Sequence, residues 1–128
     1  MSDVSLRYRS NVAVDALELG ECTIRKTRLA AATWWELWLF VPRDDCDDSE
    51  IVAVPVNVNG VFNEKGPGGR TWGLKKLGRG LWQVSPSINV VADAQACKTH
   101  PGPHPSLPSV WHHTPALVNV PEGEPWQA

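Results

Sequence analysis

A cysteine and several histidines gather near the C-terminal end of the chain, where their side chains could bind a metal ion. Two residues separate Cys97 from His100, and every histidine lies between positions 100 and 113. Thiolate and neutral imidazole are preferred zinc ligands, and a closed structural site needs four of them. Cys46, in an aspartate-rich loop, is the third candidate. We predict His112 as the fourth ligand; His104, His113 or an aspartate beside Cys46 are the alternatives.

The zinc pattern is only half of a two-knuckle signature. Free thiols and surface histidines explain the same residues equally well, since short motifs often match by chance. Four protein ligands would make the site structural, whereas a water in the fourth position would make it catalytic. An odd set of three cysteines argues against a disulfide framework. A zinc cofactor is therefore one of two hypotheses for these residues, and the other is free thiols with surface histidines.

A serine nucleophile is a second chemistry that the same region could provide. Ser85 and Ser87 flank Pro86, and His112 with an aspartate of the acidic loop could serve as base and orienting group. Nothing in the sequence positions these groups together, and Ser-Pro-Ser is commoner as a turn. The chain offers no complete catalytic set, which favours a protein that is not an enzyme.

Alternating apolar and polar residues predict the strands that must position these side chains. The pattern is strongest in Thr33–Val41, where the residues from Trp35 to Val41 at odd positions face one side. Its other side is also apolar, so we expect this strand to be central and covered. The further predicted strands are Val4–Arg9, Cys22–Leu29, Ile51–Val58, Thr71–Leu77, Leu81–Val84, Ser87–Val91 and Val110–Val120. They predict an all-β fold, a small, mostly antiparallel barrel or sandwich with little helix.

We expect one domain in three parts. Residues 1–98 form the β core, residues 99–109 a proline-rich loop, and residues 110–128 the last strand with an extended C-terminal arm. Four prolines in the loop forbid regular helix and central strand there. The chain also has seven tryptophans, a residue type that is common at interfaces. We predict that Trp111 and Trp126 contact a partner.

Composition excludes several classes of protein. The chain has 128 residues, of which 42% are hydrophobic and 20% charged, as in globular proteins. A net charge of −2 argues against general nucleic-acid binding. No apolar run could span a bilayer, and the polar start is not that of a signal peptide. We therefore expect the protein in the cytoplasm of a host cell or in a virion assembled there.

Three short segments resemble a family of small phage and bacterial proteins that often carry the label "ammonia monooxygenase". They are Trp72-Gly73, Ser85-Pro86-Ser87-Ile88 and Cys97-Lys98-Thr99-His100. The resemblance covers positions 41 to 100 and implies a β fold and a phage or mobile-element setting. The family's first knuckle has several cysteines, whereas this chain has only Cys46 among aspartates. The resemblance implies no activity.

These observations favour a non-enzymatic, phage-associated β module. It would bind a protein partner or its own copies, as a virion component or a host-interaction factor. The alternative is a zinc-dependent hydrolase or a zinc-stabilised accessory protein that uses the predicted ligands.

Overall fold

The computed structural model describes residues 4–29, 31–44, 48–66, 69–91 and 109–127, which are mostly strand. In chain order the strands are β1 (Val4–Tyr8), β2 (Glu21–Leu29), β3 (Ala32–Pro42), β4 (Ser49–Val58), β5 (Asn63–Gly66), β6 (Gly69–Gly78), β7 (Leu81–Ser85), β8 (Ile88–Val91), β9 (Ser109–His113) and β10 (Pro115–Val118). Two short 3-10 turns, η1 (Val14–Ala16) and η3 (Pro125–Gln127), complete the described elements. No helix in these ranges is long and apolar enough to cross a membrane.

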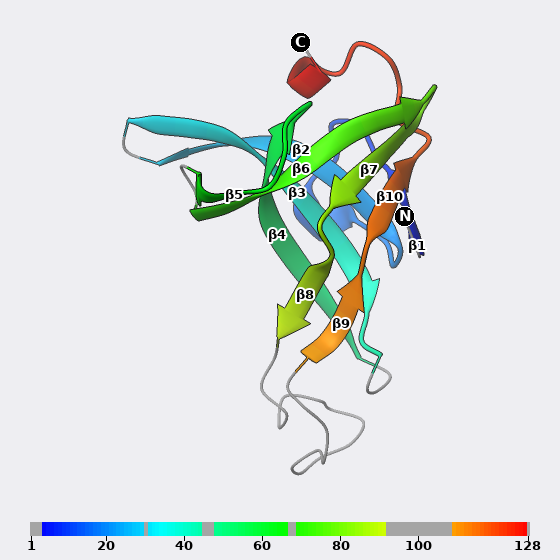
Figure 1. Ribbon diagram of the computed structural model, residues 1–128. Coiled ribbons are helices and arrows are strands. Elements are labelled where there is room, and N and C mark those ends of the chain that lie inside the picture. Colours follow the sequence, from blue (N-terminus) through cyan, green and yellow to red (C-terminus); the bar gives the residue numbers. More distant parts are fainter. Residues whose placement is uncertain (1–3, 30, 45–47, 67–68, 92–108, 128) are drawn as a thin grey trace.

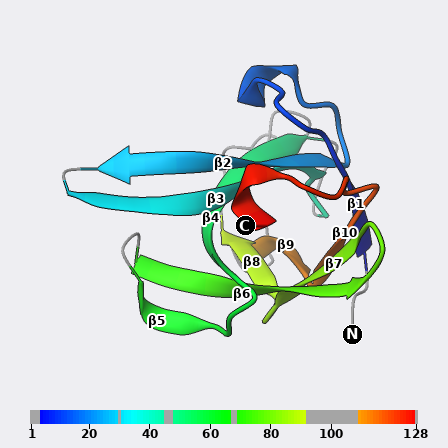
Figure 2. The ribbon, with the colours of Figure 1, turned by 90° about the horizontal axis from the view of Figure 1, so that it is seen from above.

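Seven of the strands close into a barrel (Figures 1 and 2). The order around it is β4-β3-β2-β1-β10-β7-β6, and β6 returns to pair with β4. The predicted all-β fold is therefore confirmed, and of the two predicted architectures the structure forms the barrel. Its sheet is mixed, because β1 runs parallel to both β2 and β10, and β4 runs parallel to β6. Strands joined by hairpins pair antiparallel, whereas each parallel joint needs a crossover connection, which is short for β1–β2 and β4–β6 and spans most of the chain for β1–β10.

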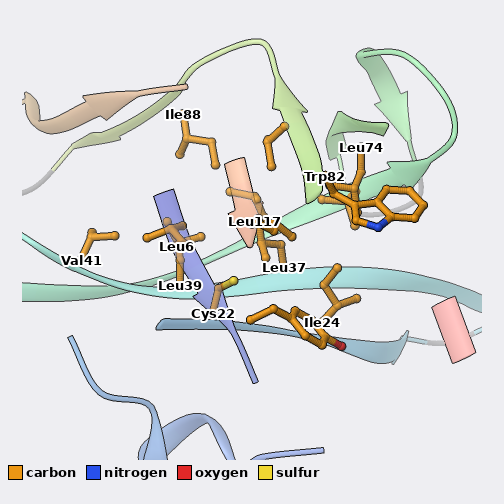
Figure 3. Packing of buried hydrophobic residues seen from close by; sticks show 14 of the residues in the cluster. Leu6, Cys22, Ile24, Leu37, Leu39, Val41, Leu74, Trp82, Ile88 and Leu117 are labelled. Atoms are coloured by element: carbon orange, nitrogen blue, oxygen red, sulfur yellow. The ribbon is translucent and has the colours of Figure 1, made fainter. Parts of the chain in front are cut away.

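The barrel interior is filled by the inward-facing side chains of alternate residues (Figure 3). On β3, Leu37, Leu39 and Val41 are buried, while the residues between them are half-buried on the outer face. The predicted two faces of this strand are thus confirmed. Leu74 and Leu117 reach the same interior from the opposite side of the barrel. Apolar burial from every wall gives the fold its main driving force.

The C-terminal segment closes the upper opening of the barrel (Figure 2). Trp126 is only 2% exposed, and its ring packs edge-on against Tyr8 and Trp82 at centroid distances of 5.8 and 4.9 Å. Its Nε1–H donates to the Tyr8 hydroxyl at 2.8 Å. The predicted C-terminal arm is therefore part of the core.

A second, two-stranded sheet of β8 and β9 extends below the barrel (Figure 1). It prolongs β7 and β10, which pair with each other inside the barrel. Ile88, Val110 and Trp111 are buried on this ribbon. The ribbon thus carries the histidines of β9 to the lower end of the molecule.

Candidate functional site

The connection between β3 and β4 contacts β9 at the lower end of the molecule. The Asp44 N–H donates to the Val110 carbonyl at 2.6 Å, and His113 Nε2 lies 2.8 Å from Asp44 Oδ2. Arg43, whose side chain is 1% exposed, is held 3.5 Å from the Glu50 carboxylate. The acidic segment and the histidine strand, which the sequence assigned to one site, therefore lie side by side.

Of the predicted zinc ligands, the structure describes only His112. Cys46, Cys97 and His100 lie outside the described residues. His112 is exposed on β9, and its Nε2 lies 2.8 Å from Ser87 Oγ. A metal at Nε2 would have to replace this hydrogen bond. Among the residues that the structure describes, no three His, Cys, Asp or Glu side chains converge. The zinc site stays a prediction.

Ser87 and His112 form the hydroxyl–imidazole pair that a serine nucleophile would need, and no carboxylate among the described residues bonds to His112. Asp44 contacts the neighbouring His113 instead. Successive residues of a strand project to opposite faces, so one aspartate cannot serve both rings. The Ser87 carbonyl accepts a hydrogen bond from Trp72 Nε1 at 3.1 Å. The pair therefore ties the start of the ribbon to the barrel and to β9.

Trp111 and Trp126, which we predicted to contact a partner, are both buried within the single chain. Their exposed fractions are 3% and 2%, and the Trp111 ring lies 4.7 Å from that of His113. Their role at an interface stays a prediction. Because either side chain supports the core, an alanine substitution there would report on folding before it reported on association.

A different feature, not visible in the sequence, is the incomplete pairing of β2. Strand β1 pairs with β2 only at Glu21 and Cys22, although β2 continues to Leu29. The chain then turns away at Asn11, which has a positive φ of 50°. The Thr23 hydroxyl donates to the carbonyl of Arg9, just after β1, at 2.7 Å. Beyond this point β2 pairs only with β3 among the described strands.

A groove of about 510 Å³ lies beside this unpaired stretch, and we call it the β2-edge groove. It is lined by β2 from Thr23 to Lys26, by Trp35, by residues 11–13 after β1 and by residues 124–126 of the C-terminal segment, together with Tyr8. The groove thus combines aromatic surface with charged side chains along a strand edge. Its walls come from segments far apart in the sequence, so no local sequence pattern could predict it.

Three cations lie on the unpaired part of β2: Arg25, Lys26 and Arg28, all exposed. The Lys26 ammonium sits 5.1 Å from the centroid of the Trp35 ring. In the part of the chain that the structure describes, none of the three forms an ion pair with a carboxylate. The three cations therefore have no direct ion-pair partner among the described residues.

The carboxylates nearest to these cations already have other partners. Glu36 lies opposite Arg25 in the register, yet it accepts a hydrogen bond from the Thr27 hydroxyl at 2.7 Å. Glu124 accepts from the Tyr8 hydroxyl at 2.6 Å and from Ser10 at 3.0 Å. Burial, and then the bond to Glu124, raise the pKa of Tyr8 above its ordinary value. Tyr8 therefore stays protonated and keeps its bond to Glu124.

A second pocket, of about 620 Å³, lies on the outer face of β6 and β7 under the turn at residues 60–62. Its lining is mainly apolar and includes Val61 and Leu77, which are 65% and 57% exposed. Gly73 allows the turn to approach, because a Cβ there would lie 2.8 Å from the Gly60 carbonyl oxygen. This pocket has no unpaired strand edge or charged cluster to define a ligand.

Comparisons with protein-family models, with curated proteins and with solved structures find no match to this chain. The resemblance to phage and bacterial proteins therefore remains an expectation from short motifs.

Proposed function

We propose that this protein is a non-enzymatic binding module that takes up an extended segment of another polypeptide along β2. The observation that carries the proposal is the unpaired edge of β2 beside the β2-edge groove. An exposed strand edge presents N–H and C=O groups that an added strand can bond, and side pockets then supply specificity.

The backbone groups of β2 support this mode of binding. The carbonyl of Gly20, just before β2, accepts a hydrogen bond from the Arg7 N–H of β1 at 2.9 Å, and the Cys22 carbonyl accepts one from the N–H of Arg9, just after β1, at 2.8 Å. Backbone groups of alternate residues in a strand point to the same side. The N–H and C=O groups of Ile24, Lys26 and Arg28 are therefore directed to the unpaired side of β2, beside the groove at Ile24 and Lys26, where the described strands offer them no partner.

The volume and lining of the groove also suit a peptide. Ligand pockets commonly measure about 300–1,000 Å³, and the β2-edge groove falls in this range at about 510 Å³. Trp35 offers an aromatic surface beside the strand edge, a common anchor in recognition. The family resemblance suggests a phage setting, in which the partner would be a virion component or a host protein.

A proline substitution tests the proposal, because it removes one N–H without disturbing the β2–β3 ladder. Linear peptides are selected from a random library against the whole chain, and their affinities are measured for Lys26→Pro and for Lys26→Ala. Loss of one backbone hydrogen bond, with the steric conflict of the ring, should weaken binding to Lys26→Pro about tenfold more than to Lys26→Ala. Proline is tolerated at such an edge, so the melting temperatures should stay close.

Equal affinities for the two variants would overturn strand addition, and so would failure of the selection to yield any peptide. A third variant, Thr27→Pro, removes an N–H on the β3 side and should lower the stability of the protein itself. If Lys26→Pro weakens peptide binding while Thr27→Pro lowers stability, the loss of binding at position 26 comes from the open edge of β2.

The zinc-dependent alternative is favoured by one observation, the contact of the acidic segment with β9 through Asp44 and His113. This contact gathers at one end of the molecule two of the segments to which the sequence assigned ligands. Elemental analysis of the purified protein tests it, with Cys97→Ser as the comparison. Zinc well below one equivalent, unchanged by the substitution, would remove this second function.

A further inference from the structure

We infer that the segment bound in the β2-edge groove is acidic, with carboxylates at alternating positions of an extended partner strand. This inference rests on the proposed function and specifies its ligand. It is carried by the three cations of β2, which have no carboxylate partner among the described residues although the chain as a whole has a net charge of −2.

The register of β2 and β3 places the cations on both faces of the ribbon. Lys26 lies opposite Trp35, and Trp35 shares its face of β3 with the core residue Leu37. Arg28, two residues beyond Lys26, projects to the same side, and Arg25 projects to the other. An added strand would therefore bring alternate side chains beside Lys26 and Arg28, next to the aromatic surface of the groove.

Two described carboxylates close to this part of β2 are hydrogen-bonded to hydroxyl groups and form no ion pair with the cations. Glu36 is bonded to Thr27, and Glu124 is bonded to Tyr8 and Ser10. Strand pairing brings opposed side chains within about 5.5 Å, where opposite charges attract and like charges repel. An acidic strand would thus form ion pairs with cations that have none among the described residues.

The same charges disfavour association of two copies through β2. Two β2 edges side by side would bring Arg25, Lys26 and Arg28 of each copy together, and such charged edges commonly protect sheets from self-pairing. We do not expect the acidic connection after β3 of a second copy to bind these cations, since its Asp44 is bonded to β9. The occupant is therefore an acidic segment of a different protein.

Three synthetic peptides test the inference against the whole protein. They share valine at alternate positions and carry glutamate, glutamine or lysine at the others. Binding is followed by ¹⁵N NMR at the amides of Ile24, Lys26 and Arg28. We expect the glutamate peptide to bind about fivefold more tightly than the glutamine peptide, as two exposed ion pairs contribute. Added salt should reduce this difference, because such pairs are screened.

A charge-reversal variant, Arg28→Glu, provides the control. It should weaken binding of the glutamate peptide and strengthen that of the lysine peptide, with the glutamine peptide nearly unchanged. If the glutamine peptide perturbs the β2 amides as strongly as the glutamate peptide does, strand addition stands and the acidic preference is refuted. If no peptide perturbs these amides, the proposed function itself is refuted. Concentration-dependent association of the protein through β2 would also contradict the inference.

Discussion

Trp126 should account for a large share of the stability of this barrel, although it lies near the end of the chain. The side chain is 2% exposed and covers the opening between Tyr8 and Trp82. Its indole N–H also donates to Tyr8, whose hydroxyl donates in turn to Glu124. Trp126→Ala removes the ring contacts and one member of this chain of hydrogen bonds together.

The expected cost follows from burial. Replacing a buried tryptophan by alanine costs about 3–5 kcal/mol, because the transfer energy of the ring is lost and a cavity remains. Trp126→Phe keeps an aromatic ring and loses the N–H, and it should cost about 1–2 kcal/mol. Since domains of this kind have a free energy of unfolding of about 5–15 kcal/mol, the alanine variant should unfold at a much lower urea concentration.

Urea unfolding followed by far-UV circular dichroism measures both variants against the parent protein, with linear extrapolation to water. A loss below about 1 kcal/mol for Trp126→Ala, with an unchanged m-value, would refute the role of the C-terminal segment as part of the core. Equal losses for alanine and phenylalanine would refute the assignment of most of the effect to ring packing.

Two further predictions concern a buried carboxylate and a close backbone contact. The Glu18 N–H donates to the Glu21 carboxylate at 2.8 Å and lowers the pKa of that carboxyl. The stabilisation of the fold by ionised Glu21 is present above the unfolded pKa of about 4.3 and is lost as the pH falls through the lower folded pKa. Urea melts of Glu21→Gln should therefore show a deficit at neutral pH that disappears in acid, and a deficit independent of pH would contradict this. Gly73→Ala places a Cβ 2.8 Å from the Gly60 carbonyl oxygen and should cost about 1–3 kcal/mol. Gly78→Ala meets nothing within 4 Å, so similar melting temperatures for the two variants would refute the steric reason.

Much of the fold could be predicted because alternation is a local property. The residues of Thr33–Val41 show which side faces the core, and the structure confirms this assignment along β3. The glycines between Leu77 and Leu81 predict the hairpin that joins β6 to β7. The parallel joints of β1 with β2 and β10 could not be predicted, because local alternation does not show which strands pair or in which direction.

The candidate sites divide in the same way. The sequence offered Ser87 and His112 as candidates for a catalytic pair but did not position them; their side chains lie 2.8 Å apart, and Asp44 contacts His113 instead. We predicted that Trp126 contacts a partner, whereas the C-terminal segment covers one opening of the barrel (Figure 2) and the Trp126 side chain is buried there. The sequence alone does not distinguish an aromatic residue in a core from one at an interface, because both environments favour aromatic side chains.

Local chemistry thus establishes the strands, their inner faces and the places where thiols, imidazoles and cations occur. The β2-edge groove depends on tertiary structure, because it exists only where β1 turns away at Asn11 and the C-terminal segment packs beside β2. A strand edge is open or paired according to its neighbours in space. The cysteine and histidine pattern can be identified from the sequence alone, whereas the unpaired edge of β2 is a consequence of how the barrel closes.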